Sequence, residues 1–348
     1  MATIFGTAAG ETLTGTRLAD DIFGLEGDDI IRGRGGNDQV DGGTGADFLI
    51  GRTGSDHYFV DAQLDKMVER LGEGDADTVF ATVSFILRRN VEHLELRGEA
   101  VRGYGNDLAN RLTVEDGQDV DNVLNGRGGA DFMSGGRGDD IYHVDDVNDT
   151  IEEVGFDTDT VRSSVSFTLG DDRDPTEQPA FLENLVLVGS AAINGTGGEL
   201  SNQIRGNSAD NVLKGLVGLD TLNGGAGDDS LYGGRNSDTL TGGEGNDGFY
   251  ITQLLFGAGF ADIIRDFTTA DDTFYLDRSV YTELPEGPLP ESAFVRGSQA
   301  QDADDRILYD SATGYVFYDP DGSGDHLSAI FAQLVPGTEV NSSDFIGY

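Results

Sequence analysis

Apolar residues recur every nine positions over much of the chain, each flanked by polar residues and followed by a glycine-rich segment. The pattern is clearest at 215–250, where four consecutive segments read GLVGLDTLN, GGAGDDSLY, GGRNSDTLT and GGEGNDGFY. The sixth and eighth positions of these copies are Asp220 and Leu222, Asp229 and Leu231, Asp238 and Leu240, and Asp247 and Phe249. A triplet with one apolar residue at its centre is the pattern of a minimal strand with a single buried side chain. Because glycine permits the positive φ angles of a tight turn, the period predicts stacked coils of short strands and turns.

The same period defines two further blocks and extends upstream of the clean copies. Segments of the first block begin at Gly6 and at every ninth residue to Gly51, and 60–68 keeps the phase. Its sixth positions are Glu11, Asp20, Asp29, Asp38, Asp47, Asp56 and Asp65. The second block begins at Gly117, and the third begins near Gly197. The sixth positions are Asn122, Asp131, Asp140 and Asp149 in the second block, and Asn202 and Asn211 in the third block before the clean copies.

Two cassettes without the nine-residue period separate the blocks. At 78–87 apolar and polar residues alternate, which predicts a longer strand with one buried face. The second cassette copies the first, since LENLVLVG at 182–189 matches VEHLELRG at 91–98. It also carries an insertion at 170–180 with two prolines, which predicts a surface loop.

The C-terminal part of the chain has a third pattern. After one further turn at Gly257–Arg265, the sequence is aromatic and strand-like, with turn signals between the apolar runs. It predicts a β-rich cap that covers the last edge of the coils.

These patterns predict an all-β fold, a right-handed parallel β-roll or β-helix solenoid with a β-rich C-terminal cap. The expected divisions are repeat blocks at 1–68, 117–153 and 197–250, longer-strand cassettes at 69–116 and 154–196, and the cap at 251–348.

The charge changes the interpretation of the repeated Asp. The chain has 64 acidic and 22 basic residues, a net charge of −42, so it should repel nucleic acid and anionic membrane surfaces. An acidic surface needed for solubility alone has no reason to follow a nine-residue phase, so divalent cations are the better explanation. There is no cysteine, which excludes a disulfide framework. No apolar run is long enough to span a membrane, and the N-terminal residues lack the pattern of a cleaved signal peptide, so an export signal is expected elsewhere.

Two nine-residue segments make one coil of 18 residues, so equivalent turns stack at that spacing. The stacking brings Asp20 over Asp38, and Asp220 over Asp238. Facing carboxylates repel each other unless a cation lies between them, and Ca²⁺ prefers six to eight oxygen ligands. The predicted metal ligands are therefore Asp20, Asp29, Asp38, Asp47, Asp56, Asp65, Asp131, Asp140, Asp149, Asp220, Asp229, Asp238 and Asp247.

On these motifs the chain resembles the repeats-in-toxin (RTX) family of secreted proteins, over most of its length. The resemblance implies a β-roll folded around several Ca²⁺ ions, each held by two Asp and by turn carbonyls. The carbonyls of positions two and four would bind the ion from one turn, and the carbonyls of positions one and three would bind it from the turn one coil later. One ion would use Leu216, Gly218 and Asp220 with Gly233, Arg235 and Asp238, and the next Gly225, Gly227 and Asp229 with Gly242, Glu244 and Asp247. Gly27, Gly36 and Gly45 hold position four in the first block, whereas Glu11, Asn122, Asn202 and Asn211 depart from the pattern and imply weak or empty sites.

The segment 262–348 resembles the cap of serralysin-type metalloproteases, in ADIIRDF, DRILYDSATGYVFYDPDGSG and the final DFIGY. That family implies an uncleaved C-terminal signal and a type I secretion exporter as partner.

No catalytic residue is predicted. No histidine begins an H-E-x-x-H motif, and neither a G-x-S-x-G elbow nor a phosphate loop is present. Asp319, Asp321, Ser323 and Asp325 imitate the start of an EF-hand loop, but the twelfth position is Ile330, so a hairpin turn is favoured over a weak extra ion site. The many Asp and Glu residues leave a carboxylate pair for sugar hydrolysis as an open alternative.

The sequence therefore predicts a secreted, extracellular or cell-surface protein without a catalytic domain, which folds on Ca²⁺ after type I export. Its expected role is structural or adhesive, with an acidic polysaccharide or a cell surface as partner. One alternative is the non-catalytic part of a secreted polysaccharide-acting enzyme, or an unrecognised one with a site at 78–112 or 160–200. Another is a pore-forming effector, which the lack of amphipathic segments disfavours.

Overall fold

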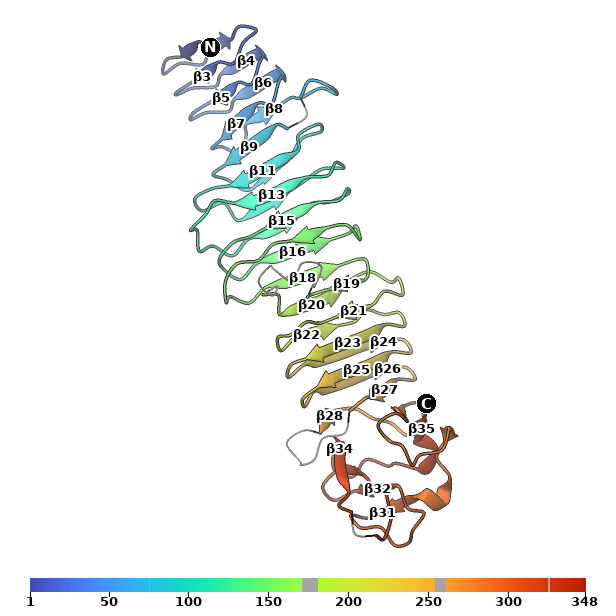
Figure 1. Cartoon of the computed structure of the whole chain (residues 1–348). Coiled ribbons are helices and arrows are strands. Elements are labelled where there is room, and N and C mark those ends of the chain that lie inside the picture. Colours follow the sequence, from blue (N-terminus) through green and yellow to red (C-terminus); the bar gives the residue numbers. More distant parts are fainter. Residues whose placement is uncertain (75, 171–180, 254–260, 325) are drawn as a thin grey trace. The chain divides into compact units, whose positions relative to one another are not determined.

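The computed structural model describes residues 1–74, 76–170, 181–253, 261–324 and 326–348 (Figure 1). The chain divides into two compact units, 1–162 and 163–348. The described residues contain β-strands and two short 3₁₀ helices, η1 (Glu291–Ala293) and η2 (Ser342–Asp344), but no α-helix. The predicted all-β, parallel solenoid fold is confirmed.

In the first unit the chain alternates between two faces of a coil, so odd- and even-numbered strands form separate parallel sheets. One sheet contains β1 (Thr3–Phe5), β3 (Asp21–Phe23), β5 (Gln39–Asp41), β7 (His57–Val60), β9 (Thr78–Ala81), β11 (His93–Leu96), β13 (Arg111–Val114), β15 (Phe132–Ser134) and β17 (Thr150–Ile151). Another contains β2 (Thr12–Thr14), β4 (Ile30–Gly35), β6 (Phe48–Thr53) and β8 (Lys66–Met67). β10 (Phe85–Ile86), β12 (Arg102–Tyr104), β14 (Val123–Asn125) and β16 (Ile141–Val144) also pair in succession, and β18 (Thr160–Ser163) contains the division between the units.

The register explains the nine-residue period. Ile22 pairs with Val40 and Ile31 with Leu49, each 18 residues on, so the apolar residues of one face stack directly. All four are fully buried. Each coil therefore contributes one apolar side chain per face to a core that grows lengthwise, as expected for a solenoid.

The second unit has the same alternation (Figure 1). One sheet contains β19 (Phe167–Thr168), β21 (Gly195–Thr196), β23 (Val212–Val217), β25 (Ser230–Arg235), β27 (Gly248–Ile251), β29 (Thr273–Leu276), β35 (Phe345–Gly347) and β30 (Gly287–Pro288). The other strands of this unit, in order of pairing, are β20 (Asn184–Leu187), β22 (Gln203–Arg205), β24 (Thr221–Ala226), β26 (Thr239–Glu244), β28 (Asp262–Ile264), β34 (Ala329–Gln333), β33 (Tyr315–Tyr318), β32 (Ile307–Asp310) and β31 (Phe294–Arg296).

The strands of the clean repeats are longer than the predicted three residues. β24 and β26 each have six, because the parallel ladder continues into the turn and pairs Gly225 with Gly243 and Ala226 with Glu244. Both glycines have positive φ angles, 111° and 109°. A Cβ atom at Gly243 would collide with the carbonyl oxygen of Gly225, so glycine is required for this close approach.

The cassettes differ from the prediction in the opposite direction. The alternating segment 78–87 forms two short strands, β9 and β10, which lie in different sheets, rather than one longer strand. Alternation continues through the corner because the coil keeps the same side chains inward on both faces. Of the predicted loop at 170–180, residues 171–180 lie outside the described residues. Residues 257–260 of the predicted turn at 257–265 also lie outside the described residues. The later part of that turn contains β28, which pairs with β26 as the prediction requires. The domain boundaries remain predictions.

The predicted cap continues both sheets of its unit. β34 pairs in parallel with β28, and β35 pairs in parallel with β29. Phe345 of β35 stacks on Phe274, which extends the buried stack into the cap. β33 and β34 pair antiparallel across 319–328, so the EF-hand-like segment is the loop of a hairpin, as favoured; its Asp325 lies outside the described residues.

Candidate calcium sites

Every Asp predicted as a metal ligand is buried: Asp20, Asp29, Asp38, Asp47, Asp56, Asp65, Asp131, Asp140, Asp149, Asp220, Asp229, Asp238 and Asp247. Aspartate is almost never fully buried unless its charge is compensated. The chain's basic residues do not supply that compensation, because the salt bridges of the described residues involve, among these Asp, only Asp20 with the N-terminal amine.

The carboxylates form ladders through one of their two oxygens. The backbone N–H of Asp20 donates to Oδ1 of Asp38 (2.8 Å), and that of Asp38 donates to Oδ1 of Asp56 (2.7 Å). In the clean block the N–H of Asp220 donates to Asp238, and that of Asp229 to Asp247, both at 2.9 Å. The predicted stacking of Asp over Asp at 18 residues is therefore the arrangement of the structure.

The second oxygen, Oδ2, turns back over the glycine that opens its own turn. A Cβ atom at Gly233 would collide with the carboxylate of Asp238, and one at Gly224 with that of Asp229. The glycine at position one of these turns thus makes room for the carboxylate. The buried Oδ2 atoms without a hydrogen-bond partner include those of Asp29, Asp38, Asp47, Asp56, Asp131, Asp220, Asp229, Asp238 and Asp247.

These orphaned oxygens fit a hard cation. Burial raises the pKa of Asp131, Asp229 and Asp238 to about 7 and that of Asp56 to about 8. A buried carboxylate oxygen without a donor is costly, and no donor among the described residues reaches these atoms. Ca²⁺ bound to carboxylate and carbonyl oxygens would remove that cost.

The turn carbonyls are partly occupied. The carbonyl of Glu244 accepts the N–H of Gly227 (2.8 Å), and that of Leu25 accepts the N–H of Thr44 (2.8 Å). A carbonyl oxygen has two lone pairs, so one remains for an ion. The individual carbonyl ligands, including those of Gly27, Gly36, Gly45, Gly218, Gly225, Gly227, Gly233 and Gly242, remain proposals.

The Asn substitutions have a physical explanation that the sequence did not reveal. The side-chain Nδ2 of Asn211 donates to the carbonyl of Ile193 (2.6 Å), and that of Asn202 donates to Leu182 (3.0 Å). Asn122 does the same toward Ala100 (2.8 Å). The amide thus donates a hydrogen bond to the preceding coil directly, whereas an Asp at the same place would need a cation. This supports the prediction of weak or empty calcium sites at these turns.

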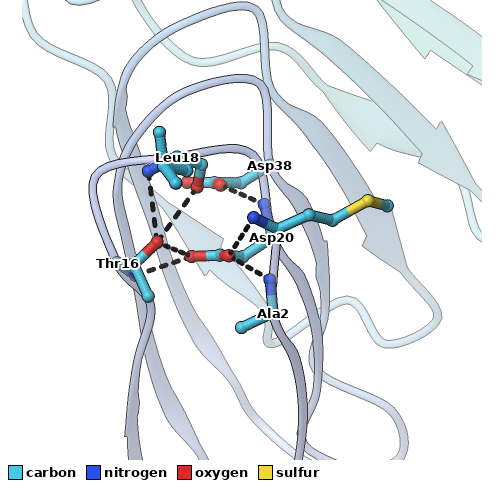
Figure 2. Close-up of polar contacts among 6 residues, drawn as sticks. Ala2, Thr16, Leu18, Asp20 and Asp38 are labelled. Atoms are coloured by element: carbon cyan, nitrogen blue, oxygen red, sulfur yellow. Dashed lines mark hydrogen bonds and ion pairs between the residues drawn. The ribbon is translucent and has the colours of Figure 1, made fainter.

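Asp20 is also an exception (Figure 2). The backbone N–H and the hydroxyl of Thr16 donate to its Oδ2 (2.6 and 2.7 Å), and the N–H of Ala2 donates to Oδ1 (2.6 Å). Burial raises the pKa of Asp20, but these hydrogen bonds outweigh it and the net pKa is lowered. This turn satisfies its carboxylate with protein donors.

Sequence periodicity missed several rungs of the ladder. Asp77 accepts the N–H of Asp56 (2.8 Å), Asp159 that of Asp140 (2.8 Å), and Asp272 that of Asp247 (3.1 Å). Their spacings of 21, 19 and 25 residues hide them from a search at 18. The signal that could have found them is an Asp immediately before a strand, as in D-T-V and D-T-F.

The raised pKa values predict an unusual pH dependence for the calcium-free chain. Since these carboxyls keep protons in the folded chain that an unfolded Asp loses near pH 3.8, the folded state binds more protons between about pH 4 and about pH 8. The free energy of unfolding should therefore fall as pH rises through this window. Acidifying metal-stripped protein from pH 8 to pH 5 should increase its far-UV circular dichroism signal of β-structure. In saturating calcium the trend should reverse, because protons then compete with the ion; loss of structure on acidification without calcium would contradict the interpretation.

No helix among the described residues has the length and apolar character needed to cross a membrane.

Comparison with known proteins agrees with the geometry. The model of the RTX calcium-binding nonapeptide repeat family matches residues 5–40, 14–49, 33–65, 104–141, 116–151 and 215–249. The chain is also similar to endo-1,3-1,4-beta-glycanase ExsH of Rhizobium meliloti (strain 1021), with 37% identity over 84 residues. That similarity spans 24% of the chain and 14% of the glycanase. The repeat matches and the buried Asp ladder show that the chain contains several RTX nonapeptide repeats, which bind several calcium ions.

Proposed function

We propose that this protein is secreted through a type I exporter, folds when it meets extracellular calcium, and serves as a structural or adhesive component outside the cell. The observation that carries the proposal is the ladder of buried carboxylates whose Oδ2 atoms lack protein donors. In a calcium-poor cytosol these charges oppose folding and keep the chain extended for export. In millimolar calcium the free energy of ion binding becomes free energy of folding. The cap at 251–348 would carry the export signal.

The proposed partner is an acidic polysaccharide or a cell surface that bears one. A chain of net charge −42 would repel such a partner unless cations or local positive charge intervene. Local positive charge is available in a recess of about 580 Å³ lined by Arg17, Arg34 and Arg52. Arg34 and Arg52 are register neighbours on β4 and β6, so their guanidinium groups can face successive carboxylates of one polymer.

Retention on immobilised polysaccharide in millimolar calcium tests this partner. We expect the protein to be retained on a polyuronate and not on a neutral glucan. R34Q/R52Q should weaken retention several-fold, whereas R137Q/R265Q, which removes the same charge from exposed sites outside the recess, should not. Because the calcium concentration is the same in every measurement, differences in calcium-dependent folding do not contribute to differences in retention. Equal retention on both polymers, or equal effects of the two variants, would overturn the assignment.

The similarity to the glycanase favours a second candidate, in which the chain is the non-catalytic part of a polysaccharide-acting enzyme. Retention of the calcium-loaded protein on an immobilised 1,3-1,4-linked β-glucan separates the two candidates, because only the second predicts it. Release of reducing ends from this glucan would instead place a catalytic site in this chain and reject both non-catalytic proposals.

A further inference from the structure

A recess of about 350 Å³ lies on the outer side of the second unit, where β23, β25 and β27 are neighbours in one sheet (Figure 1). In the parallel register Lys214 pairs with Tyr232 and Leu216 with Gly234, so the recess extends across successive coils. The described residues that line it are Lys214, Leu216, Tyr232, Gly234, Arg235 and 252–253. None of them is an Asp of the ladder.

The recess exists because residue 234 has no side chain. Gly234 has a φ angle of 108°, and a Cβ atom there would collide with the carbonyl oxygen of Leu216. Only glycine fits this backbone. Because side chains two residues apart on a strand point to the same face, the position beside Tyr232 on the outer face is left open.

One wall of the recess is a tyrosine ring that is held in place from behind. Tyr232 stacks on Tyr250 with ring centroids 4.2 Å apart, and Tyr250 stacks on Tyr275 at 4.5 Å. A ring that is already fixed loses little conformational entropy when a ligand binds to it. Leu216, which is 43% exposed, adds apolar surface at one end. The recess therefore offers a rigid, partly apolar surface to a ligand.

The charge around this surface is positive. The Nζ atom of Lys214 lies 5.4 Å from the centroid of the Tyr232 ring, and Arg235 is exposed beside the same recess. The ion pairs of the described residues include neither cation. Burial and the neighbouring tyrosines raise the pKa of Tyr232 to about 12, so its hydroxyl stays neutral and does not balance the lysine.

The absence of acidic groups from the described lining is notable in this chain, in which 64 of 348 residues are Asp or Glu. Two unpaired cations beside an apolar wall fit a ligand that is both anionic and partly apolar. A small inorganic anion would gain nothing from the tyrosine and the leucine. A sugar acid has a carboxylate for the cations and ring C–H groups for the apolar wall.

We propose that this recess binds one sugar-acid residue of an anionic polysaccharide, with the carboxylate at Lys214 and Arg235 and the sugar ring against Tyr232 and Leu216. Arginine holds a carboxylate through two parallel hydrogen bonds, which also orients the sugar. The inference deepens the proposed function, because it gives the second unit its own contact with the proposed polymer. It shares no residue with the arginine recess of the first unit, so the two sites can succeed or fail separately.

Calorimetric titration with a tetrauronate tests the site by counting bound oligomers. Saturating calcium is kept throughout, because the carbonyls of Leu216 and Arg235 are among the proposed calcium ligands. We expect two oligomers per chain, one at each recess. K214Q/R235Q should lose one of them, with affinity at that site reduced at least about tenfold by the loss of charge-assisted contacts. R137Q/R265Q removes the same charge from exposed positions elsewhere and should bind both.

Two further measurements separate a sugar site from a simple anion site. Y232L should weaken the same binding event several-fold while circular dichroism in calcium stays unchanged, and acetate at the concentration of the tetrauronate should not displace it. If K214Q/R235Q still binds as many oligomers as the unmodified chain, or if acetate competes equally, the inference is wrong. If R34Q/R52Q binds like the unmodified chain but K214Q/R235Q loses its oligomer, the first recess fails and this inference stands.

Discussion

Chelation of calcium at pH 7.5 is expected to remove most of the β-structure of the chain. Each buried carboxylate that loses its cation leaves an uncompensated charge, which costs several kcal/mol in a protein interior. A folded domain is stable by only about 5–15 kcal/mol in total. This cost applies at once to Asp29, Asp38, Asp47 and their equivalents in both units. The summed cost exceeds the free energy of unfolding, so the chain is expected to unfold. Far-UV circular dichroism and hydrodynamic radius should both report an expanded chain.

Readdition of calcium should restore the fold with a midpoint of about 0.1–1 mM, the range of extracellular calcium modules. Magnesium is the control, because it demands near-octahedral geometry and keeps its waters, and it should not restore the fold at the same concentration. A chain that keeps its full β-signal in excess chelator at this pH would show that the carboxylates are compensated in another way.

The regular part of this fold could be predicted from the sequence because one period controls both core and ladder. An 18-residue coil places Ile22 beside Val40 and, by the same register, the N–H of Asp20 beside Asp38. Glycine in the turns was predicted for its φ angles, but the position-one glycines Gly224 and Gly233 do not have positive φ. They are needed because Oδ2 of the Asp occupies the space of a Cβ atom.

What the period could not predict lies where coils change length. Asp77 continues the ladder from Asp56 across 21 residues, and its turn has Glu69 in place of glycine. The pairing of Tyr58 with Glu69 depends on contact between successive coils, which local sequence does not encode. The sequence pattern does not reveal the corner between β9 and β10 either, because side chains alternate between inward and outward both along a strand and around a bend.

Replacement of Asp229 and Asp238 by Ala is expected to raise the calcium midpoint of the whole chain more than replacement of Asp20 and Asp29. The first pair lies in the only full-consensus run beside the cap, and both of its Oδ2 atoms lack protein donors. In the second pair, Oδ2 of Asp20 already accepts two hydrogen bonds from Thr16. Loss of charge-assisted contacts worth about 1.5–3 kcal/mol corresponds to a shift in midpoint of roughly ten- to a hundredfold.

The Asn variant of the same pair separates charge from packing. D229N/D238N should shift the midpoint less than D229A/D238A, because an amide there can donate to the preceding coil as Asn211 does to Ile193. Circular dichroism across a calcium titration measures all three midpoints. A larger effect at Asp229 and Asp238 would mean that folding along the chain begins in the clean repeats, before the Asn-containing coils upstream. Equal shifts for the two Ala pairs would mean instead that the coils bind calcium independently and that folding has no preferred starting point.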